Sequence, residues 1–154
     1  DHLKLVLTGQ KIINGNIEVL NELETYIFTN NLSKSVLMTG YLSDAEISSL
    51  YKKALIYVFP SVEEGFGIPV LEAFAMRTPV VASNAEAMVE IADGAAEHYN
   101  AGDQVELFKT LTKLVASKTK RTYLIEKGTE RLKGFSRERF VKDYERLILK
   151  SVKN

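Results

Sequence analysis

Residues 60–73 decide how this chain is interpreted, and they read Pro60-Ser61-Val62-Glu63-Glu64-Gly65-Phe66-Gly67-Ile68-Pro69-Val70-Leu71-Glu72-Ala73. Two carboxylates, Glu64 and Glu72, flank a glycine-rich bend, and an apolar run precedes it. Pro69 suits the first turn of a helix, because the amide that proline lacks would be unpaired there in any case. The stretch therefore predicts a buried strand, a tight bend and a helix, in that order.

The bend combines groups that suit two parts of one ligand. Backbone amides at the start of a helix attract phosphate, and the candidates here are the amides of residues 66, 67, 68 and 70. Carboxylates accept hydrogen bonds from hydroxyl groups. A nucleotide sugar carries both phosphate and hydroxyls, so we hypothesise such a ligand.

Each carboxylate also has a plainer interpretation. Glu72 could stand in the first turn of its helix and gain about 0.3–1 kcal/mol from the helix dipole, or it could face the ligand and bind ribose hydroxyls. Glu64 could be a solvated loop residue. The residues alone leave these alternatives open.

Composition narrows the class of protein. The chain has 154 residues, of which 45% are hydrophobic and 26% charged, as is usual for a soluble globular domain. Twenty basic and 20 acidic residues balance, which argues against a nucleic-acid-binding protein. Without cysteine there is no disulfide framework or thiolate metal site, and without a clustered His/Asp pattern we expect no metal and no cofactor.

Apolar runs alternate with helical patterns along most of the chain. Buried strands are expected at residues 3–7, 35–39, 55–59 and 79–82. Helices are expected at residues 17–29, 44–53, 69–76, 103–116, 120–133 and 137–152, and Ser43 with Glu46 forms a capping-box pattern for the second. This alternation predicts an α/β fold, a Rossmann-like parallel sheet with flanking helices, as one domain over residues 1–154.

The strand ends point to the position of the site. Gly9, Gly40, Pro60-Ser61 and Ser83-Asn84 each follow an expected strand. In a parallel sheet these segments share one edge, and ligands of open α/β sheets bind at that carboxyl edge.

Several motifs together resemble one enzyme family. Residues 64–75 followed by 78–83 resemble the donor-side signature of glycosyltransferase family 4 (group 1), and residues 39–44, 50–54 and Phe135-Ser136 add further matches. These are retaining enzymes of the GT-B superfamily, in which two Rossmann-like domains face each other across a cleft. The likeness extends from about Leu3 to the end, and it is to the C-terminal, nucleotide-sugar donor-binding domain.

The resemblance implies a role for each matching residue. The catalytic position would be Glu64, in contact with hydroxyls of the donor sugar. The donor sugar and phosphate would be held by Glu64, Gly65, Phe66, Gly67 and Ile68, the ribose by Glu72, and the nucleobase by Tyr41 and Leu42. The implied reaction moves the sugar of a nucleoside-diphosphate sugar to a hydroxyl acceptor, without a metal.

The resemblance also implies missing parts. The chain begins at what resembles the second strand of the donor domain, so we expect a fragment that lacks that first strand and the N-terminal acceptor domain. An acceptor glycan or lipid-linked sugar would bind the missing domain, and we expect the isolated chain to be inactive as a transferase. Relatives usually have glycine where this chain has Arg77, while Glu90 matches a glutamate that recurs in the family.

A cytoplasmic location is expected, and the basic residues of 137–152 suggest peripheral contact with the cytoplasmic face of a membrane. Two other functions remain open: another GT-B enzyme, such as a nucleotide-sugar epimerase or a phosphorylase, and a non-catalytic nucleotide-binding module.

Overall fold

The computed structural model describes residues 3–9, 17–136, 139 and 141, and the chain divides into two compact units, Asp1–Ile47 and Ser48–Asn154. The strands are β1 (Leu5–Thr8), β2 (Val36–Gly40), β3 (Tyr57–Phe59), β4 (Val80–Ser83) and β5 (Ala96–Tyr99). The helices are α1 (Ile17–Thr29), α2 (Asp44–Lys53), α3 (Ile68–Ala75), α4 (Glu86–Ala92), α5 (Gln104–Ala116) and α6 (Lys118–Leu132), followed by the 3-10 turn η1 (Lys133–Phe135).

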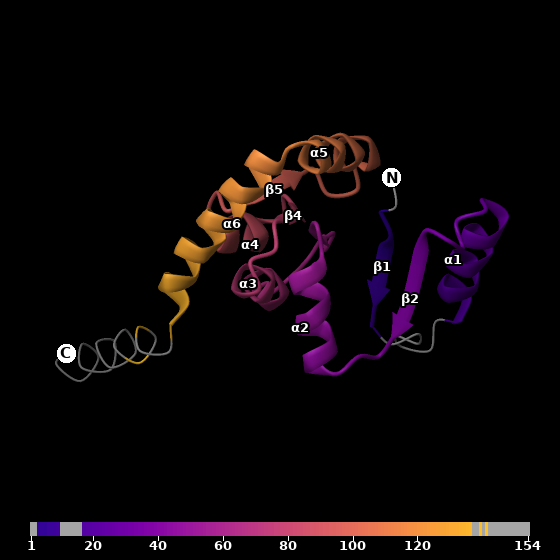
Figure 1. Cartoon of the computed structure of the whole chain (residues 1–154), viewed down its shortest axis with the longest axis horizontal. Helices are drawn as coiled ribbons and strands as arrows, with labels where there is room; N and C mark the ends of the chain where they lie inside the picture. Colours follow the sequence, from indigo (N-terminus) through magenta and orange to yellow (C-terminus); the bar gives the residue numbers. More distant parts are fainter. Residues whose placement is uncertain (1–2, 10–16, 137–138, 140, 142–154) are drawn as a thin grey trace. The chain divides into compact units, whose positions relative to one another are not determined.

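The first unit contains the parallel pair β1 and β2, drawn side by side in Figure 1. Both strands lie where they were predicted, but they are less buried than expected, since Leu5 is 53% exposed and Leu37 is 51% exposed. A parallel sheet is normally covered on both faces. Two strands and one complete helix do not supply enough apolar surface to cover both faces here.

Helix α2 begins at the predicted capping box. The Ser43 amide and hydroxyl donate to Glu46 Oε2 at 2.9 and 2.6 Å, and the Glu46 amide donates back to Ser43 Oγ at 3.4 Å. These hydrogen bonds hold the pKa of the Glu46 carboxyl below its usual value. Sequence and structure agree on both ends of this helix.

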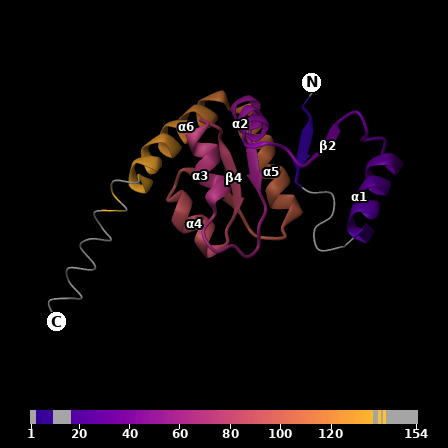
Figure 2. The ribbon, with the colours of Figure 1, turned by 90° about the horizontal axis from the view of Figure 1, so that it is seen from below.

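The second unit is built on a three-stranded parallel sheet in the order β3-β4-β5. Figure 2 shows α3 and α4 on one side of β4 and α5 on the other. Because helices cover both faces, every residue of β4 is buried, as expected for a central parallel strand. This confirms the predicted α/β class with parallel strands and flanking helices.

Alternate residues of the sheet pack on opposite faces. On the α5 side, Val81 and Tyr99 join Leu114 and Leu124 in a buried cluster. Helix α6 supplies Leu124 to this cluster and continues to α3, where Gly128 lies directly against Phe74. Helix α6 thus touches elements on both sides of the sheet.

Two elements of this unit were not predicted, α4 and β5. Helix α4 has only seven residues, which is too short for helical periodicity to stand out. Strand β5 reads Ala96-Glu97-His98-Tyr99, so a charged and a polar residue interrupt its apolar pattern. Both escaped prediction because packing in the unit, rather than local sequence, determines them.

Other boundaries shift slightly. Helix α6 begins at Lys118 rather than Lys120, because Ser117 caps it by accepting a hydrogen bond from the Lys120 amide at 3.2 Å. The helix expected over 137–152, with its basic residues, lies outside the described residues except for positions 139 and 141. No helix in the described ranges combines the length and apolar character needed to cross a membrane.

Arg77 occupies the position where the family resemblance leads us to expect glycine, and its backbone conformation is one that glycine adopts without strain. Helix α3 ends at Ala75, and Arg77 follows in the left-handed region with φ of +60°. Its amide donates to the Phe74 carbonyl at 3.0 Å, so the turn is fixed in this form. Residues with a β-carbon are strained in this region, whereas glycine is not.

Replacing Arg77 by glycine is therefore expected to stabilise the chain. We expect Arg77→Gly to raise the free energy of unfolding by on the order of 1 kcal/mol, measured by urea denaturation. Arg77→Ala is the matched control, because it removes the charge but keeps the β-carbon. A gain of the same size from alanine would assign the effect to charge instead of backbone strain.

Gly128 permits the close approach of α6 to α3. A β-carbon at this position would lie 2.7 Å from Phe74 Cδ1 and 3.3 Å from Phe74 Cβ, so turning the ring alone would not relieve the contact. We expect Gly128→Ala to destabilise the chain by about 1–3 kcal/mol, although alanine is intrinsically the better helix former.

Thermal unfolding measures this effect, and Gly134→Ala is its control, since a β-carbon there would have Arg139 Nη1 as its nearest neighbour at 3.8 Å. A Gly128→Ala chain as stable as the parent would show that α6 and α3 are not in such close contact.

Two tyrosines pack against each other where α2 meets β3. The rings of Tyr51 and Tyr57 meet edge to face with centroids 4.9 Å apart, and Thr78 Oγ1 donates to the Tyr51 carbonyl at 2.6 Å. Burial raises the pKa of both hydroxyls, and the neighbouring Glu72 carboxylate raises each of them further.

Stability should consequently fall in alkaline solution. Above about pH 10 the unfolded chain loses its phenolic protons while the folded chain retains those of Tyr51 and Tyr57, so the free energy of unfolding decreases as pH rises. Urea denaturation across this pH range measures the slope, and Tyr51→Phe should make it shallower. An equal slope in the parent chain and this variant would contradict the assignment.

Candidate functional site

Side-chain hydrogen bonds join the carboxyl ends of the three strands in the second unit. The hydroxyl of buried Ser83, at the end of β4, donates to the Ser61 carbonyl beyond β3. The Ser83 carbonyl lies 2.9 Å from His98 Nδ1 on β5. Since a carbonyl oxygen only accepts, Nδ1 carries the proton and His98 has a structural role at this edge.

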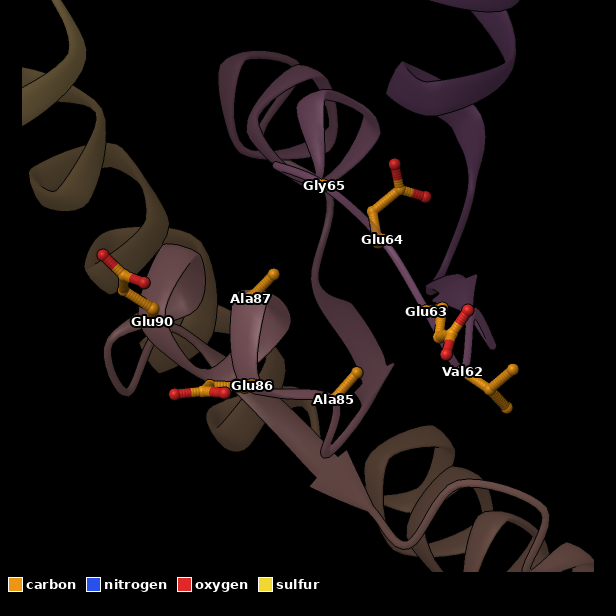
Figure 3. Close-up of a pocket in the computed structure, with 8 residues that line it drawn as sticks. All are labelled: Val62, Glu63, Glu64, Gly65, Ala85, Glu86, Ala87 and Glu90. Carbon is orange, nitrogen blue, oxygen red and sulfur yellow. The ribbon is translucent and has the colours of Figure 1, made fainter.

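A pocket of about 760 Å³ lies beside this edge. The loop after β3 forms one wall and the start of α4 forms the other, as Figure 3 shows. Its lining residues are Val62, Glu63, Glu64, Gly65, Ala85, Glu86, Ala87 and Glu90. The pocket therefore lies at the edge where the strand ends predicted a site.

Carboxylates dominate the pocket, and none of the residues that line it is a lysine or an arginine. In Figure 3 the Glu64 side chain extends from the loop near α3. The side chains of Glu86 and Glu90 extend from α4 in the direction away from that loop. The acids thus do not converge on one point. Such a lining favours hydroxyl groups, which donate hydrogen bonds, over phosphate, which is anionic.

Gly67 connects the bend to α3 and fits closely against α4. Its φ is +84°, and a β-carbon on it would lie 2.5 Å from Met88 Cε. The backbone angle disfavours any side chain at this position, and a β-carbon would in addition displace the end of the fully buried Met88 side chain. Glycine here sets the approach of the bend to α4.

Helix α3 then begins at Ile68, with Pro69 in its first turn as predicted. The first amides of a helix have no partner within it, which leaves those around Ile68 directed out of the helix end. The expectation that the Val70 amide is also open is wrong, because this amide donates to the Gly67 carbonyl at 3.0 Å. The candidate phosphate-binding amides are thus those of Phe66, Gly67 and Ile68.

Glu72 lies further along α3 than the dipole interpretation assumed. The first turn of α3 has no acidic residue, so that interpretation is wrong. Glu72 is exposed, and the Tyr51 hydroxyl lies 3.4 Å from its Oε2 and 3.4 Å from the Pro69 carbonyl oxygen. This contact engages one carboxylate oxygen and leaves the other for a ligand.

The two predicted acids are not neutralised by basic side chains. The described part of the chain has ion pairs between Lys120 and Glu97, Arg131 and Asp93, and Lys133 and Glu130. None of them involves Glu64 or Glu72.

The predicted site residues are distributed over both units. Glu64 and Gly65 line the pocket, Phe66, Gly67 and Ile68 follow them to the start of α3, and Glu72 lies on α3. Tyr41 and Leu42 belong to the first unit, where they follow β2 and Tyr41 is 77% exposed.

The α4 wall was missed, apart from Glu90. Ala85, Glu86 and Ala87 line the pocket without a distinctive residue pattern. Their position directly after a strand end, Ser83-Asn84, was the available signal.

Comparison with known proteins identifies the family. The family model for glycosyl transferases group 1 matches residues 1–131. The O-antigen chain mannosyltransferase RfbU of Salmonella typhimurium is 33% identical over 93 residues, which are 60% of this chain and 26% of that protein.

Solved structures agree on the fold. The C-terminal domain of a glycosyl transferase group 1 family protein (LpcC) from Francisella tularensis has a TM-score of 0.70 at 27% identity, over 79% of this chain and 64% of that one. HepE from Anabaena has a TM-score of 0.81 at 20% identity, over 98% of this chain and 41% of that one. This chain therefore spans only part of these longer proteins. The family match and the shared fold show that the chain belongs to the group 1 glycosyl transferases and has the fold of a GT-B C-terminal domain.

Proposed function

We propose that this chain binds a nucleoside-diphosphate sugar as the donor half of a retaining glycosyltransferase. One observation carries this function: Glu64 lies in a pocket wall at the carboxyl edge, just before the N-terminus of α3, and forms no ion pair with the described residues. Its relatives add support, since RfbU is a mannosyltransferase and HepE was solved in complex with UDP.

The distribution of charge assigns different parts of the donor to different places. The pocket between the loop and α4 is acidic, so it takes the sugar, whose hydroxyls donate hydrogen bonds to Glu64. The diphosphate lies instead at the amides of Phe66, Gly67 and Ile68, where the helix dipole favours negative charge.

Transfer requires charge stabilisation more than it requires a nucleophile. As the bond from the sugar to the diphosphate breaks, negative charge grows on the departing phosphate oxygen, and amides already aimed at it stabilise that charge. Glu64 holds the sugar in place while positive character develops on the ring, which makes it the residue most directly involved in catalysis.

Glu72 completes the donor site by holding the ribose. The Tyr51 hydroxyl at 3.4 Å from Oε2 orients the carboxylate. The other oxygen is then placed to accept a hydrogen bond from a ribose hydroxyl. Tyr41 and Leu42 retain their proposed role at the nucleobase.

The rest of the reaction lies outside this chain in our proposal. The acceptor, a glycan or lipid-linked sugar, binds a separate domain of a longer protein, and RfbU, matched over 26% of its length, is consistent with that. We expect the 154-residue chain alone to bind donor weakly and to transfer little sugar.

Other functions fit the site less well. A GT-B epimerase or phosphorylase would share the fold but would need a different set of residues around the sugar. A non-catalytic nucleotide-binding module would have no use for a carboxylate placed to bind sugar hydroxyls, as we propose for Glu64.

Binding experiments separate the roles of the two acids. The chain is titrated with UDP, GDP and ADP and with their sugar conjugates, followed by NMR amide shifts and calorimetry. We expect shifts centred on residues 40–42 and 64–72 for the preferred nucleotide. Glu72→Ala should weaken binding of the nucleotide and of its sugar conjugate by about 1.5–3 kcal/mol each, the usual contribution of a hydrogen bond to a charged group. Glu64→Gln should weaken only the sugar conjugate.

Glu126→Ala is the control, because Glu126 is an exposed acid on α6 outside the pocket lining. Equal losses for nucleotide and sugar conjugate in Glu64→Gln would contradict its assignment to the sugar. A parent chain that binds none of the panel would refute the donor function itself.

A further inference from the structure

Arg131, on α6, uses its whole guanidinium group, and the donor site as described above does not include it. Nε donates to the Ile91 carbonyl at 2.9 Å and Nη2 donates to the Glu90 carbonyl at 2.8 Å. Nη1 lies 3.4 Å from Asp93 Oδ2. Carbonyls in the last turn of a helix lack partners within it, and a cation is favourable there. Arg131 therefore caps α4 from outside.

The same guanidinium also reaches toward the glycine-rich bend. It lies over the ring of Phe135 at 4.9 Å from the centroid. Phe135 in turn meets Phe66 edge to face, with centroids 6.2 Å apart and ring planes at 86°. Phe66 stands between Gly65 and Gly67, so these contacts form a continuous path from α4 to the bend.

These two ends of the path are the two walls of the pocket. Gly65 belongs to the loop wall and Glu90 to the α4 wall (Figure 3). We infer that Arg131 is a positioning residue that fixes the separation of the two walls, with Phe135 as its link to the bend. Where it bears on the donor, this inference rests on the proposed function, because the wall separation sets how Glu64 and the amides of the bend meet the ligand together.

The planar fork of arginine is essential to this arrangement. It donates to two neighbouring carbonyls while its central carbon lies over an aromatic ring, which the single ammonium of lysine does not reproduce. Arg131→Lys should therefore weaken donor binding and move the amides of residues 65–67, as Arg131→Gln does, although it keeps the charge.

A second arginine of α6 offers a matched control. Arg121 Nη1 donates to the Leu114 and Val115 carbonyls at 2.7 and 2.6 Å, and so caps the end of α5 by the same chemistry. Its acceptors do not line the pocket. Arg131 thus caps a helix that forms a wall of the pocket, whereas Arg121 caps a helix that does not.

The experiment compares Arg131→Gln, Arg131→Lys, Phe135→Leu and Arg121→Gln in the 154-residue chain. Thermal unfolding reports stability, and NMR amide shifts of residues 65–67 in ligand-free chains report the geometry of the bend. Calorimetry with the nucleotide sugar that the parent binds best reports affinity.

We expect both glutamine variants to lower the melting temperature. Only changes at 131 and 135 should move the amides of residues 65–67 and weaken donor binding, by at least about tenfold. Phe135→Leu keeps the cap on α4, so it should weaken donor binding with less loss of stability than Arg131→Gln. If Arg131→Gln does not fold, Phe135→Leu still tests whether the link to the bend affects donor binding.

Unchanged amides at residues 65–67 in Phe135→Leu and Arg131→Lys would overturn the inference, as would equal effects from Arg121→Gln. If the parent chain binds no nucleotide sugar, the proposed function fails, while the ligand-free shifts still decide whether Arg131 positions the bend.

Discussion

The close contact between the Gly67 backbone and the Met88 side chain is the constraint on which the second unit depends. A left-handed residue without a side chain lets the bend turn into α3 while lying directly on α4. Gly67 is also the residue that precedes the first turn of α3, so the same position joins the bend, α3 and α4. It also brings the loop wall and the α4 wall of the pocket together, so fold and site have one common cause.

The surroundings of this contact explain why it is held in place. Ser83 ties the ends of β3 and β4 through Ser61 and accepts a hydrogen bond from His98 on β5, so partly buried polar contacts join the strands at the sheet edge beside the pocket. Buried hydrogen bonds of this kind are costly to break. The Arg131 guanidinium acts on the opposite end of α4. The sheet edge and both walls of the pocket are thus each held by specific contacts.

How far the sequence predicts the structure depends on how local each cause is. The capping box of Ser43 and Glu46 is complete within four residues, and it located the start of α2. Strand β5 has no local signal, because Glu97 and His98 interrupt its pattern and its place in the sheet comes from pairing with β4. Helix α4 also lacks a local signal, because its seven residues are too few for a helical pattern to stand out.

The candidate site shows the same division. The carboxyl edge and Glu64 followed from the order of strands and from one motif. The α4 wall did not, because Ala85 and Ala87 contribute shape instead of chemistry. The open amide expected at Val70 was wrong because a turn within the helix end used it. Such details depend on backbone geometry, which a residue pattern does not specify.

The exposed strands of the first unit have a practical consequence. In the described residues β1 pairs with β2 alone, so its other edge has no partner there. Leu5 and Val6 on this strand, and Leu3 just before it, are exposed. An apolar strand with an open edge is a template for strands of other molecules. Within the first unit, β1 therefore offers the kind of edge on which lysine substitutions prevent pairing with other strands.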